Sequence, residues 1–340
     1  MKPDEIIKLR QVMGTDPARA PERSDQIVVG CQGITVEMID YPSNPYEAIF
    51  EGVTATWGDR MTWGHKWDRA SPEGRLRTLL AVLSRKTLPE ILEGPKFTFA
   101  IDGPSRACFD QFARHRIGVG INSVGTRDNN WLDASLRIPH EIDDDLEQLE
   151  AHRKAFFFAK EAYAYTVNTA KESWQSARFI LPMGTTHRWI MTANYLALQN
   201  MSFQRMKFCE QFDTVGTMWL MWFEVHQEFP LLSAFMRPGC DWAKGCQYHQ
   251  TYSLSELFGA LFKGCGRHLV KDGEKYAEFN RACSTIGEVE RDIGVLIPRP
   301  QEWGRIVYNA ILDDPYLDIE GLEKKSIATL VKEVTGTDVE

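Results

Sequence analysis

The stretch KFTFAIDGPSRACFDQFARHR, residues 96–116, decides the fold that the sequence predicts. Its first eight residues alternate apolar and polar side chains, a pattern typical of a half-buried strand. Pro104 and Ser105 follow. Serine caps the first turn of many helices, so we expect a helix that begins here and ends near His115. A strand, a cap and a helix therefore lead directly into a basic segment.

The basic segment continues as IGVGINSVGTR and mixes cationic side chains with glycines. Its cationic residues are Arg114, His115, Arg116 and Arg127. Guanidinium groups form bidentate hydrogen bonds with phosphates, and glycines let backbone N–H groups approach the same oxygens. The segment therefore predicts a site for a mononucleotide or a dinucleotide cofactor. In the alternative interpretation these charges pair with nearby carboxylates, which are Asp102, Asp110 and Asp128.

Composition narrows the class of protein. The 340 residues carry a formal net charge of −8, with 43% hydrophobic and 25% charged residues, which predicts a globular protein with a sizeable core. The acidic balance disfavours binding to nucleic acid or to a membrane surface. No apolar leader or membrane-spanning run is present, so we expect a cytoplasmic protein. Seven cysteines without regular close spacing predict free thiols.

Other patterns predict a core of mixed α and β structure. GITVEMIDY, residues 33–41, alternates like a strand, and PYEAIFEGVTATWG, residues 45–58, has the spacing of a helix. Further helices are expected over residues 139–178 and 186–228, and near 3–12, 274–291 and 322–335. We expect three parts, namely an N-terminal arm at 1–30, a catalytic domain at 31–240 and a C-terminal helical extension at 241–340.

Two ordered blocks of the chain resemble the signature of flavin-dependent thymidylate synthases. The first is PEILEGPKFTFAIDGPSRACFDQFARHR with the segment that closes on Arg127, and the second is QSARFILPMGTTHRWIMTANYLALQNMSFQRMKFCEQ. The resemblance covers roughly residues 33–240, and two ordered blocks are more specific than either alone. In the second block Asn194 and Arg205 are 11 residues apart, so on one helix they would share a face, as would Asn200 and Gln211.

The resemblance implies an α+β fold, with a twisted, mainly antiparallel sheet flanked by long helices, assembled as a homotetramer with active sites at subunit interfaces. It also implies transfer of a one-carbon unit from methylenetetrahydrofolate to C5 of dUMP, giving dTMP, while NADPH reduces FAD. The residues that it assigns to the nucleotide are Gln111, Ser123, Gly125, Thr126, Arg127, Arg178 and Arg205, with Arg127 and Arg205 catalytic. Those that it assigns to the flavin are Glu93, Arg114, His115, Arg116, Asn122, Asn194 and Asn200.

The chain departs from the family pattern at four positions. Gly125 stands where the family has serine, Leu196 where it has arginine, and Gly94 and Leu88 where it has histidines. These departures fall mostly on the cofactor side of the predicted site. They suit an alternative function, in which the chain is a divergent paralogue that makes another C5-modified pyrimidine nucleotide, such as 5-hydroxymethyl-dUMP.

Two alternatives belong to other classes of protein. A metal-supported binding module would use the cysteines and histidines at Cys240, Cys246, His249, Cys265 and His268, although their spacing misses the usual zinc knuckle. We therefore predict no metal. A nucleic-acid reader would stack bases on Trp131, Trp189 and Trp242, which the acidic composition disfavours.

Overall fold

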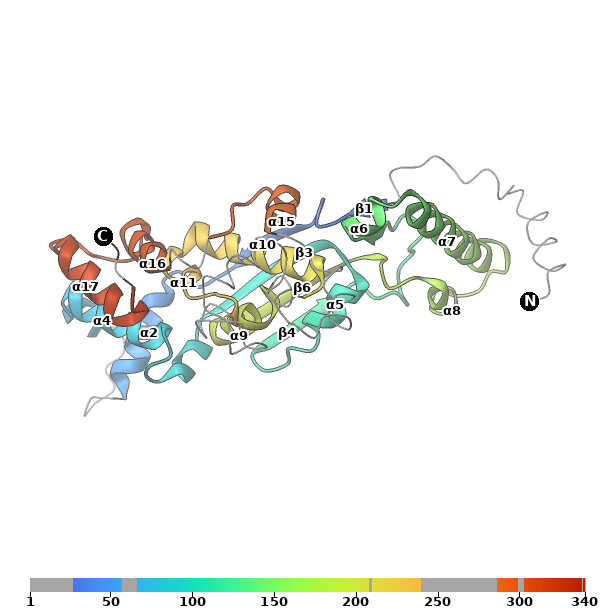
Figure 1. Ribbon diagram of the computed structural model, residues 1–340. Coiled ribbons are helices and arrows are strands. Elements are labelled where there is room, and N and C mark those ends of the chain that lie inside the picture. Colours follow the sequence, from blue (N-terminus) through green and yellow to red (C-terminus); the bar gives the residue numbers. More distant parts are fainter. Residues whose placement is uncertain are drawn as a thin grey trace, which may run out of the picture.

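The computed structural model describes residues 27–56, 66–207, 210–239, 286–298, 303–337 and 339. Figure 1 shows an elongated molecule with a sheet at its centre, helices α7 and α8 at one end, and α2, α4, α16 and α17 at the other. The bounds of these helices are Pro45–Ala55 for α2, Pro72–Leu83 for α4, Leu146–Ala164 for α7, Trp174–Ala177 for α8, Trp303–Asp313 for α16 and Lys324–Thr335 for α17. The helices predicted near 45–58 and 322–335 are thus confirmed, whereas the one near 3–12 lies outside the described residues.

Four antiparallel strands form the central sheet in the order β2-β3-β6-β4. Their bounds are Thr35–Asp40 for β2, Lys96–Ser105 for β3, Val119–Ser123 for β4 and Thr186–Asn194 for β6. A separate parallel pair joins β1, Ile27–Val29, to β5, Leu136–Ile138. The predicted α+β class with a mainly antiparallel sheet is confirmed, and GITVEMIDY is strand β2.

Strand β3 and helix α5, Arg106–Phe112, form the predicted strand, cap and helix. Phe97, Phe99 and Ile101 alternate into the core and are at most 2% exposed. The Oγ atom of Ser105 accepts a hydrogen bond from the backbone N–H of Cys108 at 3.1 Å, which satisfies one of the free donors at the start of α5. The basic segment, which follows α5, therefore begins at a fixed position.

The helix predicted over residues 186–228 is wrong in its first part. Its first nine residues form β6, followed by α9, Tyr195–Arg205, and α10, Phe212–Glu228. Along β6 the buried positions alternate, and the strand pairs with β3 on one side and β4 on the other. Pairing on both edges outweighs the helical spacing of the apolar residues. The two 11-residue pairs therefore do not share one helix.

Helix α10 packs across β2 and β3 and supplies much of the core. Met218, Trp219, Met221 and Trp222 are each at most 5% exposed, so this Met- and Trp-rich stretch is part of the core. The indole N–H of Trp222 donates to the backbone oxygen of Ser233 at 2.9 Å and ties α10 to α11, Pro230–Ser233.

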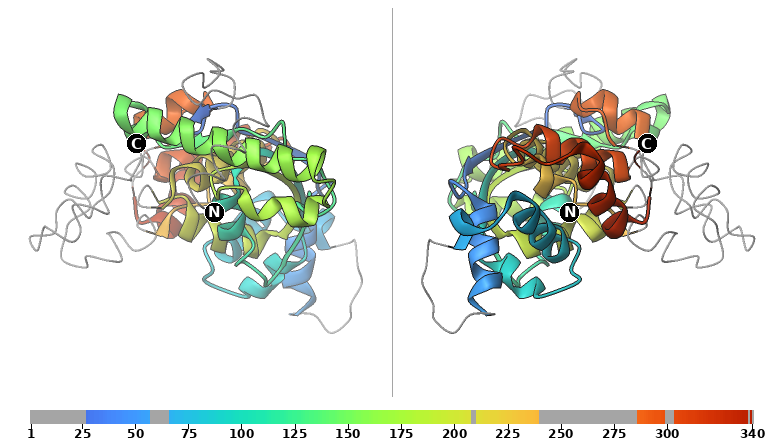
Figure 2. Two further views of the ribbon diagram at one scale, coloured as in Figure 1. Left: turned by 90° about the vertical axis from the view of Figure 1, so that its right-hand side faces the viewer. Right: turned by 90° about the vertical axis from the view of Figure 1, so that its left-hand side faces the viewer.

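The tract predicted as helix over 139–178 consists of several pieces. Helix α6, His140–Asp143, precedes α7, and the π-helical turn η3, Tyr165–Thr169, follows it. After α8 the short 3₁₀ helix η4, Arg178–Ile180, ends just before Leu181 and Pro182. The left view of Figure 2 looks onto this end of the molecule, with α7 toward the viewer.

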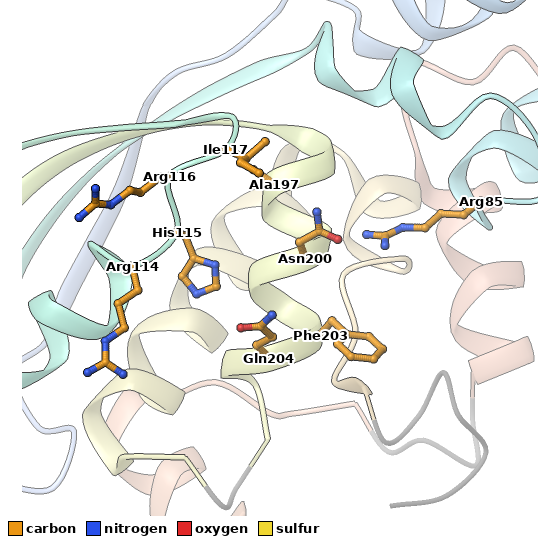
Figure 3. A pocket seen from close by; sticks show the side chains of 9 residues that line it. All are labelled: Arg85, Arg114, His115, Arg116, Ile117, Ala197, Asn200, Phe203 and Gln204. Carbon is orange, nitrogen blue, oxygen red and sulfur yellow. The ribbon is translucent and has the colours of Figure 1, made fainter. Parts of the chain in front are cut away.

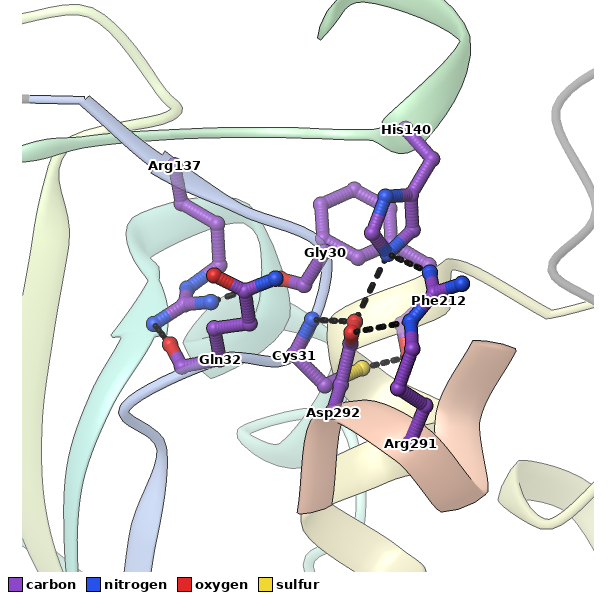
Figure 4. A network of polar contacts seen from close by, with 8 residues as sticks. All are labelled: Gly30, Cys31, Gln32, Arg137, His140, Phe212, Arg291 and Asp292. Carbon is purple, nitrogen blue, oxygen red and sulfur yellow. Dashed lines mark hydrogen bonds and ion pairs between the residues drawn. The ribbon is translucent and has the colours of Figure 1, made fainter. Parts of the chain in front are cut away.

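Helix α15, Ile286–Ile293, is linked to the turn after β1 by the buried carboxylate of Asp292 (Figure 4). The Oδ2 atom of Asp292 accepts from the backbone N–H of Cys31 at 2.7 Å and lies 2.8 Å from Nε2 of His140. The Arg137 guanidinium binds the turn after β1, because it donates to the backbone oxygens of Gly30 and Gln32 at 2.6 and 2.9 Å. This network joins segments from three distant parts of the chain.

Helices α16 and α17 share the main hydrophobic core with the sheet. Val307, Ile311 and Leu330 are at most 2% exposed and belong to one cluster with the side chains of α2, α4 and α10. The Tyr46 hydroxyl on α2 donates to the buried carboxylate of Asp314, which follows α16. The division of the chain at residue 240 stays a prediction.

Among the residues that the structure describes, no helix is long and apolar enough to cross a lipid bilayer. Cys31 and Cys108 are buried free thiols, as predicted for these two positions. The predicted metal-ligand candidates between residues 240 and 268 lie outside the described residues, as does Trp242.

Candidate functional site

A basic pocket of about 590 Å³, here called the α9 pocket, lies between the basic segment and helix α9 (Figure 3). The residues that line it are Arg85, Arg114, His115, Arg116, Ile117, Ala197, Asn200, Phe203 and Gln204. The lining contains three arginines and two amides but no carboxylate. The pocket therefore suits an anionic ligand with hydrogen-bonding edges.

Gly118 lets the basic segment approach the start of α9. It has a φ of +71°, and its backbone oxygen accepts from the N–H of Asn194 at 2.9 Å. A Cβ atom at this position would lie 2.4 Å from Nδ2 of Asn194. The Oδ1 atom of Asn194 caps α9 by accepting from the N–H of Ala197 at 2.8 Å. The contact thus fixes the basic segment against the helix that completes the pocket.

His115 and Arg205 form a hydrogen-bonded pair beside the pocket. The Arg205 Nε–H group donates to Nε2 of His115 at 3.1 Å. Burial, together with the neighbouring Arg205 charge, lowers the pKa of His115 to about 4. His115 is therefore neutral at pH 7 and can act as the acceptor. Arg205 also pairs with Glu210 at 2.7 Å, so its guanidinium is held in one orientation.

A second pocket of about 440 Å³, here called the Arg178 pocket, lies beside α5. Its lining is Arg106, Asp110, Thr126, Trp131, Arg178, Phe179, Leu181, Pro182, Met183, Thr185 and His187. Arg178 and Thr126 come from the two signature blocks, and their Nη1 and Oγ1 atoms lie 3.5 Å apart. The structure thus brings one predicted nucleotide residue from each block into one cavity.

His187 forms an inner wall of the Arg178 pocket. Its ring stacks on Trp131 with centroids 5.1 Å apart and planes 17° apart. Burial, followed by the charges of Arg106 and Arg188, lowers the pKa of His187 to about 4. A neutral ring accepts at Nε2 from Arg106 at 3.3 Å and leaves Nδ1 as a buried donor, which has no partner among the described residues. The wall is therefore aromatic and uncharged.

The remaining predicted nucleotide residues line neither pocket. Arg127 is about 61% exposed and pairs with Asp128 at 3.2 Å, which matches the ion-pair alternative for this residue. Ser123 ends β4 at the surface, and Gly125 lies in the turn before Thr126. Gln111, on α5, accepts from the side chain of Arg114 at 3.4 Å.

Only some of the predicted flavin residues line a pocket. Arg114, His115, Arg116 and Asn200 line the α9 pocket together. Asn122 is exposed on β4, and Glu93 is exposed at the end of the 3₁₀ helix η2, Pro89–Glu93. Asn194 serves as the cap of α9. Their roles toward a flavin stay predictions.

The departures from the family pattern remove polar groups near α9. Leu196 packs against the main core, so this position offers no cation to the α9 pocket. Leu88, with a φ of +41°, is the residue before η2, and Gly94 is the residue after it.

Five residues of the α9 pocket were not predicted from the sequence, and one of them, Ala197, lies in the first turn of α9. Phe203 and Gln204 lie three and four residues after Asn200, so helical spacing alone could have found them. Arg85 and Ile117 lie outside the residues that the resemblance assigns. In the Arg178 pocket, Arg106 and His187 were missed for the same reason.

The chain is similar to known proteins of one family. A family model described as thymidylate synthase complementing protein matches residues 37–231, more than half of the chain. A flavin-dependent thymidylate synthase from Pyrococcus furiosus is 28% identical over 252 residues, covering 72% of this chain and 98% of that protein. The corresponding protein from Pyrococcus abyssi is 28% identical over 227 residues, covering 62% and 84%.

The fold also resembles that of a solved structure. The UMP/dUMP methylase PolB from Streptomyces cacaoi, bound with 5-Br dUMP, superposes with a TM-score of 0.51 at 16% sequence identity, covering 62% of this chain and 96% of that chain. The comparisons define an enzyme similar to flavin-dependent thymidylate synthases. The chain belongs to the thymidylate synthase complementing protein family, and the resemblance seen in the two blocks is confirmed.

Proposed function

We propose that the protein transfers a one-carbon unit from methylenetetrahydrofolate to C5 of dUMP, giving dTMP, with FAD as cofactor and NADPH as reductant. One observation supports this most directly. Side chains from two sequence blocks about 90 residues apart line one basic pocket without a carboxylate, in a chain of this family. The two Pyrococcus relatives are flavin-dependent thymidylate synthases, which favours the same reaction class here.

The residues of the α9 pocket fit a flavin dinucleotide. Arg114 and Arg116 offer guanidinium groups to a diphosphate, and the amides of Asn200 and Gln204 offer donors and acceptors to a ring edge. Phe203 adds an apolar surface. When bound, the flavin would supply the reducing equivalents of the reaction.

The Arg178 pocket fits the nucleotide. Arg178 would neutralise the phosphate, and the Thr126 hydroxyl beside it can hydrogen-bond to the same group. Arg205 does not line the Arg178 pocket and lies beside the α9 pocket; by the family resemblance, it would stabilise negative charge that develops on a uracil oxygen as C5 attacks the carbon donor. Neutral His115 and the Glu210 carboxylate keep the guanidinium of Arg205 oriented for this task.

A second candidate is transfer that ends in another C5-modified pyrimidine nucleotide, such as 5-hydroxymethyl-dUMP. Leu196 and Gly94 favour it, because they present no polar group where the family pattern has an arginine and a histidine. A changed flavin environment would redirect the step that completes the methyl group. We further propose a homotetramer with interfacial active sites, by analogy with the family.

Two variants test the assignment of the pockets. Asn200→Ala should weaken FAD binding about tenfold, the effect of losing one or two hydrogen bonds to a charged or polar ligand, as followed by flavin fluorescence. Gln227→Ala, an exposed amide on α10, is the matched control. Unchanged FAD affinity in the Asn200 variant would count against the α9 pocket as the flavin site.

The nucleotide site is tested separately by calorimetry. Arg178→Ala should weaken dUMP binding to the FAD-loaded protein at least tenfold, because one guanidinium–phosphate contact is lost. Arg153→Ala, an exposed arginine on α7, is the matched control. Equal dUMP affinity in the two variants would reject the Arg178 pocket as the phosphate site.

A further inference from the structure

We propose that Arg85 forms a second anion-binding end of the α9 pocket and contacts the diphosphate of the dinucleotide cofactor. The inference rests on the proposed function, because it concerns the flavin dinucleotide that this pocket would hold. Arg85 precedes the first signature block, so neither block assigns it a role.

Arg85 reaches the pocket from the side of α9 opposite the basic segment (Figure 3). It follows the end of α4, and its guanidinium is directed toward Asn200. Arg114 and Arg116 line the pocket on the other side, next to His115. The pocket is therefore cationic at both ends with an amide between them. A ligand with two linked negative groups, such as a diphosphate, suits this arrangement better than a ligand with a single charge.

Hydrogen bonds through the buried Gln199 hold the Arg85 side chain in place. Its Nε–H group donates to Oε1 of Gln199 at 2.9 Å. Gln199 is only 1% exposed, and its amide nitrogen donates to the backbone oxygen of Leu83 at 3.0 Å and to the Tyr195 hydroxyl at 3.3 Å. A buried, fully bonded amide thus holds Nε and leaves both Nη groups for a ligand.

The charge of Arg85 has no carboxylate partner within ion-pair distance among the described residues. Arg77, on the same helix α4, differs because it pairs with Glu73 and Glu333, each at 3.1 Å. The positive charge at Arg85 is therefore available to an anion in the pocket, whereas that of Arg77 is already neutralised.

The backbone of Arg85 supports a role for its side chain. It has a φ of +59°, in the left-handed region that favours glycine at the end of a helix. Its N–H donates to the oxygen of Val82 at 2.8 Å, and the N–H of Lys86 donates to that of Ala81 at 2.9 Å, which closes α4. Glycine would make this turn without strain. The contacts of the Arg85 side chain with Gln199 and with the α9 pocket give a reason for arginine at this position.

The test is FAD titration of the full chain, followed by flavin fluorescence at low and high ionic strength. Arg85→Gln and Arg85→Gly should each weaken FAD binding about tenfold, and the affinity should depend less on salt, because one charge contact is lost. Arg85→Gly also removes the backbone strain, so it keeps the fold, which thermal unfolding without FAD checks. Arg85→Lys should bind with intermediate affinity. Arg77→Gln should bind within twofold of wild type.

Wild-type affinity and salt dependence in both Arg85→Gln and Arg85→Gly would overturn the inference while leaving the proposed function intact. Failure of the wild-type chain to bind FAD would overturn the proposed function and this inference together. A loss of affinity equal in Arg85→Gln and Arg77→Gln would show a general effect of net charge and would also overturn it.

Discussion

Substituting Gly118 with alanine should destabilise the protein by about 2–3 kcal/mol and open the α9 pocket. An alanine with the observed φ of +71° costs about 1–2 kcal/mol in the left-handed region. The added Cβ atom would lie 2.4 Å from Nδ2 and 2.6 Å from Oδ1 of Asn194, so that side chain must move. Its movement breaks the cap on α9, which contributes about 1 kcal/mol.

Gly120→Ala is the matched control for this prediction. Gly120 lies two residues further along, on β4, and a Cβ atom there would have nothing within 4 Å. Urea denaturation without ligand should therefore give Gly120→Ala a stability within about 0.5 kcal/mol of wild type. FAD titration should show weaker binding in the Gly118 variant alone. Equal stability of the two variants would refute the view that Gly118 fixes the basic segment against α9.

Three further substitutions test other parts of the structure. Asp292→Ala should lower the free energy of unfolding by about 3 kcal/mol in urea denaturation, because the buried acceptor of two hydrogen bonds is lost. Asp318→Ala, at an exposed aspartate, is the control and should lower it by less than about 0.5 kcal/mol. Similar losses in the two variants would contradict the network of Figure 4. Tyr46→Phe should cost about 2 kcal/mol, because the buried carboxylate of Asp314 loses one of its three donors and keeps only the backbone N–H groups of Leu231 and Tyr316, and a wild-type melting temperature would count against that bond. His187→Gln should reduce the loss of stability between pH 6.5 and 4. Burial lowers the pKa of His187 to about 4, so the unfolded chain binds a proton that the folded chain does not, and stability falls as the pH falls through this window. A variant with the same acid dependence as wild type would contradict this.

Local signals in the sequence were sufficient for the segment that carries the basic residues. The alternation of β3 and the cap at Ser105 depend on neighbouring residues only, and both occur as predicted. The contact between Arg178 and Thr126 follows from the family resemblance rather than from spacing.

Tertiary contacts explain what the sequence did not reveal. Strand β6 has helical spacing of apolar residues, yet it lies between two strands that bond to both of its edges. As a result Asn194 caps a helix instead of lying on its face. Arg85 reaches the α9 pocket only because α4 ends beside α9, a placement that no local pattern encodes.

Mass spectrometry of the nucleotides is the most direct test of the proposed reaction. The purified protein would be incubated with dUMP, methylenetetrahydrofolate, NADPH and FAD, with the Arg178→Ala variant in parallel. We expect most of the dUMP to gain a methyl group in the wild-type reaction and much less of it to do so with the variant. A hydroxymethyl product would select the second candidate function, and unchanged dUMP in a protein with bound FAD would contradict the proposed one-carbon transfer to dUMP.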